Sequence, residues 1–194
     1  SDAAGQSIPP LAVLDAARDD FARIAGLDRL CRALHFRNFA QQATSPPDDW
    51  LFLNRNAEVF LRGAETGEAE FLAEACRTLA IPPERLVIEI LEDAVQDIER
   101  LQEAAAYFRR LGCLVALDDF GAGHSNFDRV WRLKPEIVKL DRTLIVSAAA
   151  DGKLRRFLAQ MVQLLHEAGA MVLLEGIETA HEAYIAMESD VDFV

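Results

Sequence analysis

The sequence has little positive charge and no long apolar run, and each shortage excludes a class of protein. Twenty Lys and Arg stand against 32 Asp and Glu, for a formal net charge of -12, so the basic surface that duplex nucleic acid requires is missing. No segment approaches the ~20 consecutive apolar residues of a membrane span. We therefore expect no membrane contact from this segment and a cytoplasmic location, free or as the cytoplasmic domain of a larger, membrane-associated protein.

Cysteine is also scarce, with three residues in 194. Cys31, Cys76 and Cys113 are far apart in the sequence, which suggests neither a zinc site nor a disulfide framework. Each has apolar neighbours, so we expect buried free thiols in a reducing compartment. Hydrophobic residues make up 51% of the chain, enough for one domain with a substantial core.

Short apolar strands alternate with amphipathic helices along the chain. The predicted strands are Leu51 to Asn54, Leu86 to Ile90, Leu114 to Asp119, Ile137 to Asp141, Met171 to Gly176 and Val191 to Val194. Two helices are expected before the first strand, over 11–24 and 28–39, and others over 95–111 and 154–165, with Gly112 and Gly169 at helix ends. This alternation predicts the α/β class, with a parallel sheet covered by helices, either open or closed as a (β/α)-barrel.

Polar side chains stand where five successive strands end. They are Asn54, Glu89, Asp118 with Asp119, Lys139 with Asp141, and Glu175. The spacing between them leaves room for one crossover unit each, and in a (β/α)-barrel the carboxyl ends of the strands meet at one mouth, where active sites are built. The pattern therefore favours a TIM-barrel-like fold over an open sheet.

Asp118 and Asp119 are adjacent carboxylates after a buried strand, and keeping both ionised costs several kcal/mol unless a cation offsets their charge. With Asp141 left aside, the strand ends supply four carboxylates, one amide oxygen and one ammonium. Oxygen donors suit hard divalent ions such as Mg²⁺ or Mn²⁺. The set resembles a two-metal hydrolytic centre for phosphoryl displacement.

Five segments in this order resemble the EAL domain family. They are Phe52-Leu53-Asn54, Val87 to Glu92, Leu117 to Ser125 with its Asp-Asp-Phe-Gly-Ala-Gly string, Val138 to Arg142 and Leu174 to Thr179. The resemblance implies a modified (β/α)-barrel that hydrolyses cyclic di-GMP to linear pGpG. It also implies bacterial second-messenger signalling, a homodimer, and further signalling domains in the parent chain.

The resemblance assigns a role to each matching residue. It implies that Asn54, Glu89 and Asp118 hold one metal ion, that Asp118, Asp119 and Glu175 hold the second, and that Asp118 bridges the two. Lys139 would orient the attacking water or help to deprotonate it, and Glu178 would support the water and metal network. Glu92 would anchor the loop from Phe120 to Phe127, which couples metal binding to dimer contacts in this family.

The chain also departs from the family pattern. The Glu-Ala-Leu motif, which supplies another metal-ligating Glu and a nearby substrate-contacting Arg, is absent, and Asp192-Phe193-Val194 stop where members usually continue. Leu91 stands where the family usually has Thr. Residues 1–194 are therefore expected to form a single EAL-like domain that is truncated at both ends, within a larger parent protein, and to hydrolyse cyclic di-GMP poorly.

Each singled-out residue also has a purely structural interpretation. Asn54 suits a turn cap, Glu89 and Glu175 suit solvent-facing strand ends, and Asp118-Asp119 suits a helix cap. A salt bridge to Asp141 would explain Lys139, and Glu178-Thr179 resembles a helix start, while His124 is read as a loop side chain and the acidic run 65–74 as a solvated helix face. Two further functions stay open, a catalytically inactive EAL-like receptor or protein-interaction module, and an enolase-type barrel metalloenzyme.

Overall fold

The computed structural model describes residues 20–42, 49–55, 57–62, 67–91, 97–122 and 127–194. Five parallel strands form one sheet in the order β1-β2-β3-β4-β5. Their bounds are β1 Leu51–Asn54, β2 Leu86–Leu91, β3 Leu114–Phe120, β4 Ile137–Leu140 and β5 Met171–Leu174. Each strand therefore pairs with its neighbour in the sequence, which is the connectivity of a (β/α)-barrel wall.

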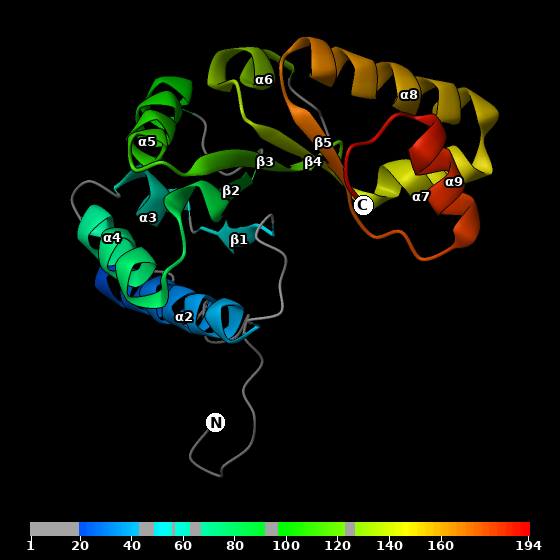
Figure 1. The fold of residues 1–194 in the computed structure, drawn as a ribbon. Helices are drawn as coiled ribbons and strands as arrows, with labels where there is room; N and C mark the ends of the chain where they lie inside the picture. Colours follow the sequence, from blue (N-terminus) through cyan, green and yellow to red (C-terminus); the bar gives the residue numbers. More distant parts are fainter. Residues whose placement is uncertain (1–19, 43–48, 56, 63–66, 92–96, 123–126) are drawn as a thin grey trace.

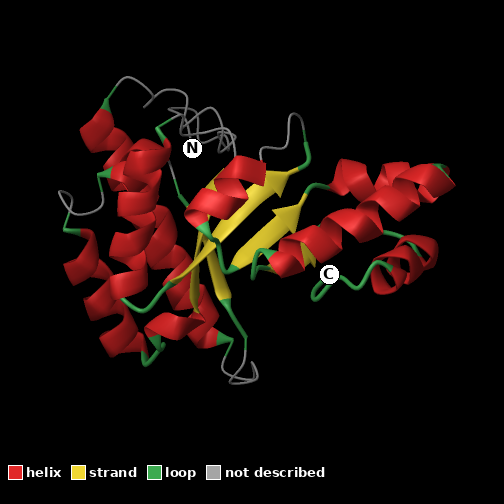
Figure 2. Cartoon of the chain, turned by 90° about the horizontal axis from the view of Figure 1, so that it is seen from above, coloured by secondary structure: helices red, strands yellow, loops and turns green. Residues whose placement is uncertain are grey.

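Helices connect the strands and pack around the sheet (Figures 1 and 2). They are α2 Phe21–Gln41, α3 Ala57–Leu61, α4 Glu68–Leu79, the 3₁₀ turn η2 Pro83–Arg85, α5 Ile98–Arg110, α6 Phe127–Leu133, α7 Arg142–Ala150, α8 Gly152–Glu167 and α9 Ala180–Glu188. Figure 1 shows α2 beneath β1 with α4 beside α2, and α7, α8 and α9 beyond β5. None of the helices that the structure describes has both the length and the apolar character needed to cross a bilayer.

The two faces of the sheet carry different apolar clusters. The larger cluster joins alternate strand residues such as Leu53, Ile88 and Val138 to the covering helices. The smaller cluster lies on the opposite face, with Val87, Ala116 and Ile137 fully buried at its centre. Because side chains alternate between the faces of a strand, the smaller cluster marks the concave, barrel-lining side.

Local sequence signals account for several helix boundaries. Asp20, Asp97, Asp141 and Asp151 each accept a backbone N–H at a helix start. Thr179 and Glu182 form a capping box at the start of α9. Gly112 (φ 93°) and Gly169 (φ 88°) follow α5 and α8 in the left-handed conformation, as predicted for helix ends.

Four expectations need correction. One continuous helix, α2, runs through the predicted break between Ile24 and residue 28, while 11–19 lie outside the described residues. Residues 191–194 form no strand beyond a single bridge from Phe193 to Leu173. Cys31 is exposed, whereas Cys76 and Cys113 are buried thiols. The acidic run is not wholly solvated, because Glu68 is buried at 1% exposure between two arginines.

Candidate metal centre

Strand alternation brings the predicted polar residues to one face of the sheet. The barrel-lining cluster includes the residue two places before each polar residue. These residues are Phe52, Val87, Ala116 and Ile137 on β1 to β4, and Leu173 before Glu175. One period further along, the same face therefore presents Asn54, Glu89, Asp118, Lys139 and Glu175 at the carboxyl ends of the strands. Asn54 is the direct parallel-strand partner of Glu89. These five positions therefore lie on one face of the sheet, at the carboxyl ends of their strands.

Lys139 stands at the centre of the mouth and contacts three carboxylates. Its Nζ lies 2.8 Å from Asp118 Oδ1 and 2.7 Å from Glu175 Oε1, and it also pairs with Glu89. Glu89, Asp118 and Lys139 are each at most 7% exposed, and only Glu175 reaches toward solvent. These contacts replace the ion pair with Asp141 considered above, because the Asp141 carboxylate caps α7 by accepting the Thr143 N–H at 2.8 Å.

The pKa values of this cluster follow from burial and from the crowding of charge. Burial raises the pKa of Glu89 above its ordinary value, although the Lys139 ammonium opposes the shift. Burial alone would lower the pKa of Lys139, but its hydrogen bonds to Asp118, Glu175 and Glu89 outweigh this and raise it. Lys139 is therefore a firmly protonated donor in this arrangement.

Asp119 faces outward from a β-bulge. The ladder between β3 and β4 shifts register between Leu117 and Phe120, and Asp119 has a φ of 57°, the left-handed region that bulge residues adopt. Its backbone N–H donates to Asp118 Oδ1 at 3.1 Å. Burial, and then the charge of Asp118, raise the pKa of Asp119. The bulge thus keeps both adjacent carboxylates at the mouth, with the Asp118 side chain buried and the Asp119 side chain exposed.

The donor set fits a divalent cation. Ligand oxygens of Glu89, Asp118 and Glu175 all lie within 4.8 Å of one another, and these three negative charges are matched by one ammonium. The Lys139 ammonium sits where the three carboxylates converge and so stands in for a cation there. An excess of ionised oxygen ligands in a partly buried mouth is the environment that Mg²⁺ or Mn²⁺ would stabilise.

Other predicted residues lie apart from this cluster or outside the described part. The Glu178 carboxylate pairs with Arg142 Nη2 at 2.5 Å and is exposed, next to the α9 helix start that the sequence suggested. Glu92 and His124 fall outside the described residues, as do the other residues of 123–126 in the loop from Phe120 to Phe127. The ends of that loop meet, since the Phe120 and Phe127 rings contact edge to face with centroids 5.2 Å apart.

One residue next to the mouth, Arg142, was not singled out from the sequence. Arg142 holds Glu178, and its side chain covers Gly176, where an added Cβ would lie 2.7 Å from Arg142 Cδ. Gly176 has a φ of 73°, so the glycine is required both by its conformation and by this close approach. The only sequence signal was the position of Arg142 directly after the fourth strand segment.

Taken together, the parallel β/α sheet and the acidic mouth at its carboxyl ends define a TIM-barrel-like protein with a candidate metal centre. Comparison with known families matches the EAL domain over residues 1–194. The chain belongs to the EAL domain family.

Curated relatives and solved structures agree with this assignment. The chain is similar to cyclic di-GMP phosphodiesterase TpdA of Vibrio parahaemolyticus, with 30% identity over 101 residues, 52% of this chain and 18% of that protein. It is 29% identical to cyclic di-GMP phosphodiesterase RocR of Pseudomonas aeruginosa over 112 residues, 57% of this chain and 29% of that one. The chain thus spans less than a third of the length of these relatives.

The fold resembles that of solved EAL proteins. A Klebsiella pneumoniae BlrP1 complex with calcium and cyclic di-GMP superposes with a TM-score of 0.82 at 22% identity, covering 95% of this chain and 46% of that one. The Xanthomonas citri FimX EAL domain in complex with cyclic di-GMP gives a TM-score of 0.81 at 20% identity, covering 96% and 73%. At this identity the likeness establishes the fold alone.

Proposed function

We propose that this chain is the phosphodiesterase domain of a metal-dependent enzyme that hydrolyses cyclic di-GMP to linear pGpG. The observation that carries the proposal is the convergence of Glu89, Asp118 and Glu175 at the carboxyl ends of three strands. Membership of the EAL family and the likeness to named cyclic di-GMP phosphodiesterases support the choice of substrate. A homodimer and further signalling domains stay predictions.

The carboxylates and Asn54 would hold two divalent ions. Asn54, Glu89 and Asp118 would bind the first, Asp118, Asp119 and Glu175 the second, and Mg²⁺ or Mn²⁺ suits these oxygen donors. When bound, such ions activate water and neutralise charge on the phosphodiester. BlrP1 structures to which this chain is similar contain cyclic di-GMP with manganese or calcium, which supports a divalent ion without choosing between Mg²⁺ and Mn²⁺.

The chain's own residues orient the reactants. Lys139 is a protonated donor whose stem is fixed by β4, so it would orient the attacking water from within the mouth. The water oxygen attacks phosphorus, and one P–O ester bond of the ring breaks. One of the two protons of the water ends on the departing oxygen, and the other stays with the new terminal phosphate. Asp119 lies beside Asp118 at the mouth, where it would take part in catalysis as a ligand of the second ion. Glu178 would support this network through Arg142.

A second candidate is cyclic di-GMP binding without hydrolysis. It is favoured by the contacts of Lys139, whose ammonium pairs with Glu89, Asp118 and Glu175 together. If these ion pairs persist when the nucleotide binds, the domain would act as a receptor.

Replacing Asp118 with Asn tests the proposal. Asp118→Asn removes the carboxylate shared by both proposed ions, so pGpG formation in excess Mn²⁺ should fall at least ~100-fold while the fold is kept. Glu103→Gln, an exposed carboxylate on α5, is the matched control and should leave turnover unchanged. Ca²⁺ should support little hydrolysis, because its looser coordination misplaces the nucleophile.

The assay should use the parent protein and measure nucleotide binding alongside pGpG. Unchanged turnover in Asp118→Asn would sink the catalytic assignment. Tight cyclic di-GMP binding with no pGpG from the wild-type parent would establish the receptor alternative.

A further inference from the structure

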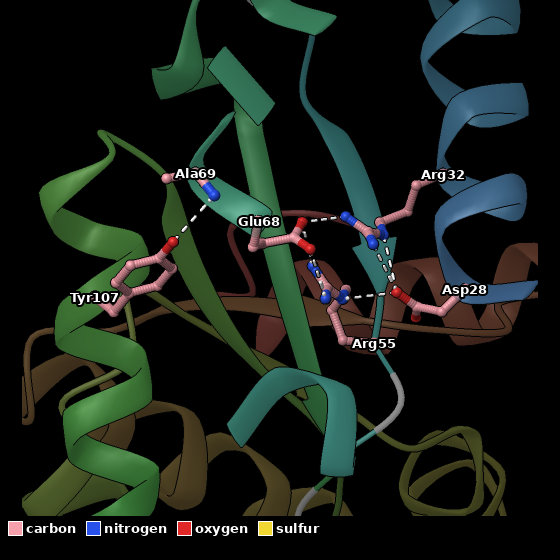
Figure 3. A network of polar contacts seen from close by, with 6 residues as sticks. All are labelled: Asp28, Arg32, Arg55, Glu68, Ala69 and Tyr107. Carbon is pink, nitrogen blue, oxygen red and sulfur yellow. Dashed lines mark hydrogen bonds and ion pairs between the residues drawn. The ribbon is translucent and has the colours of Figure 1, made fainter. Parts of the chain in front are cut away.

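A closed ring of four buried charges lies behind the β1 side of the mouth (Figure 3). Glu68, the first residue of α4, accepts from Arg55 Nη1 at 2.9 Å and from Arg32 of α2. Asp28, one turn before Arg32, lies 2.9 Å from Arg32 Nη2 and 3.4 Å from Arg55 Nε. None of the four side chains is more than 8% exposed. Charges alternate around the ring, and their sum is zero.

Aromatic and backbone contacts hold the ring in place. The Arg32 guanidinium lies 4.9 Å from the Phe71 ring centroid, and that of Arg55 lies 5.5 Å from that of Phe108 on α5. In the same network, the Ala69 N–H donates to Tyr107 Oη at 3.0 Å. Arg55 is thereby fixed against α2, α4 and α5 at once.

Stability alone does not explain such a ring. Four buried charges carry a large desolvation cost, and burial followed by the charge of Arg55 lowers even the pKa of Arg32. Replacing comparable buried ion networks with apolar residues is often neutral or stabilising. What a charged ring adds is a defined geometry. A guanidinium donates its hydrogen bonds in fixed directions, so only a few arrangements of the carboxylates satisfy it.

Arg55 links the ring to the proposed ligand Asn54, which directly precedes it in the sequence. Arg55 follows Asn54, so strand alternation points Asn54 into the mouth and Arg55 toward the helices. β1 has only four residues, and within the described ranges it is hydrogen-bonded to β2 alone. Its carboxyl end therefore depends on side-chain contacts for its position, and Arg55 supplies the charged ones.

We propose that the ring of Asp28, Arg32, Arg55 and Glu68 is a positioning device that sets the end of β1, and with it Asn54, for metal binding. Its members are positioning residues and touch neither metal nor substrate. The proposal rests on the proposed function only in taking the mouth as a metal site.

The test replaces the ring without leaving a buried charge unpaired. The fourfold variant Asp28→Leu, Arg32→Met, Arg55→Met and Glu68→Leu should keep the wild-type melting temperature or exceed it. Arg55→Lys is the conservative variant, which keeps the charge but loses the two-sided fork. The control, Arg155→Met with Glu188→Gln, removes an ion pair between α8 and α9 and leaves the mouth unchanged.

Two measurements on the whole chain decide the outcome. Calorimetric titration with Mn²⁺ should give a dissociation constant raised ~10-fold in the fourfold variant and less in Arg55→Lys. Hydrogen exchange without metal should quicken ~10-fold at Phe52 to Asn54 and stay unchanged in β3 and β4. The control should match wild type in both.

The proposal requires both the weaker Mn²⁺ binding and the faster hydrogen exchange at the end of β1. A fourfold variant that shows only one of the two changes, or neither, overturns it. Should the fourfold variant fail to fold, Arg55→Lys decides by the same two readouts. Wild-type protein that binds no Mn²⁺ overturns the metal site and this proposal together. Wild-type parent protein that binds Mn²⁺ yet forms no pGpG overturns only the proposed catalysis.

Discussion

Among individual side chains, Lys139 decides whether three carboxylates can stay ionised side by side. It supplies the only positive charge that the structure, over its described ranges, shows in contact with Glu89, Asp118 and Glu175. Removing one partner of a buried charge cluster leaves the others uncompensated, and this costs more than the cluster was worth.

Lys139→Met should therefore lower the free energy of unfolding of the metal-free protein by about 3 kcal/mol. Urea unfolding in EDTA measures this loss. Added Mn²⁺ should recover most of it, because the ion replaces the missing positive charge. Lys153→Met, at an exposed site on α8, should change stability by less than about 0.5 kcal/mol. Equal stability of Lys139→Met and wild type in EDTA would contradict the charge argument.

The buried Cys113 thiol gives a pH dependence with a defined sign. Burial raises the pKa of Cys113 from 9.0 to about 12, so the unfolded thiol ionises first. Its contribution to stability is complete below pH 9 and is lost as the pH rises from 9 toward 12, by about 1.4 kcal/mol at pH 10. Denaturant unfolding from pH 8 to 10 should show a slope that Cys113→Ala reduces and Cys31→Ala, at an exposed thiol, does not.

Among the turns between elements, the one after β3 depends on a glycine. Gly121 has a φ of 99°, and an added Cβ would lie 2.5 Å from Leu144 Cδ1 of α7. Gly121→Ala should destabilise the protein by about 2 kcal/mol, through backbone strain and this clash. Thermal unfolding measures the loss. Gly152→Ala is the control, since an added Cβ meets nothing within 4 Å there, and similar losses in both variants would contradict the explanation.

Strands and mouth were predictable because their signals are local. The five strand starts follow from apolar runs. The two-residue periodicity of a strand then puts Glu89, Asp118 and Lys139 on the same face of the sheet. The break predicted in α2 was wrong because Ile24 packs against Val59 and the helix continues through Gly26. The ring around Glu68 was missed because its partners lie 36 and 13 residues away in the sequence, a distance that no periodicity spans.

The molecule as a whole carries a net charge of -12, and a bound divalent ion should stabilise it by mass action. Mn²⁺ at 100 times its dissociation constant adds about 2.7 kcal/mol to the free energy of unfolding, which for a chain of this length raises the melting temperature by about 8 °C. Screening of the acidic surface raises it as well, so the comparison needs NaCl at equal ionic strength. Asp118→Asn separates the two effects, because it should keep the response to NaCl and lose most of the response to Mn²⁺. Equal shifts with Mn²⁺ and NaCl in the wild-type chain would mean that the ions act on the surface charge and not at the mouth.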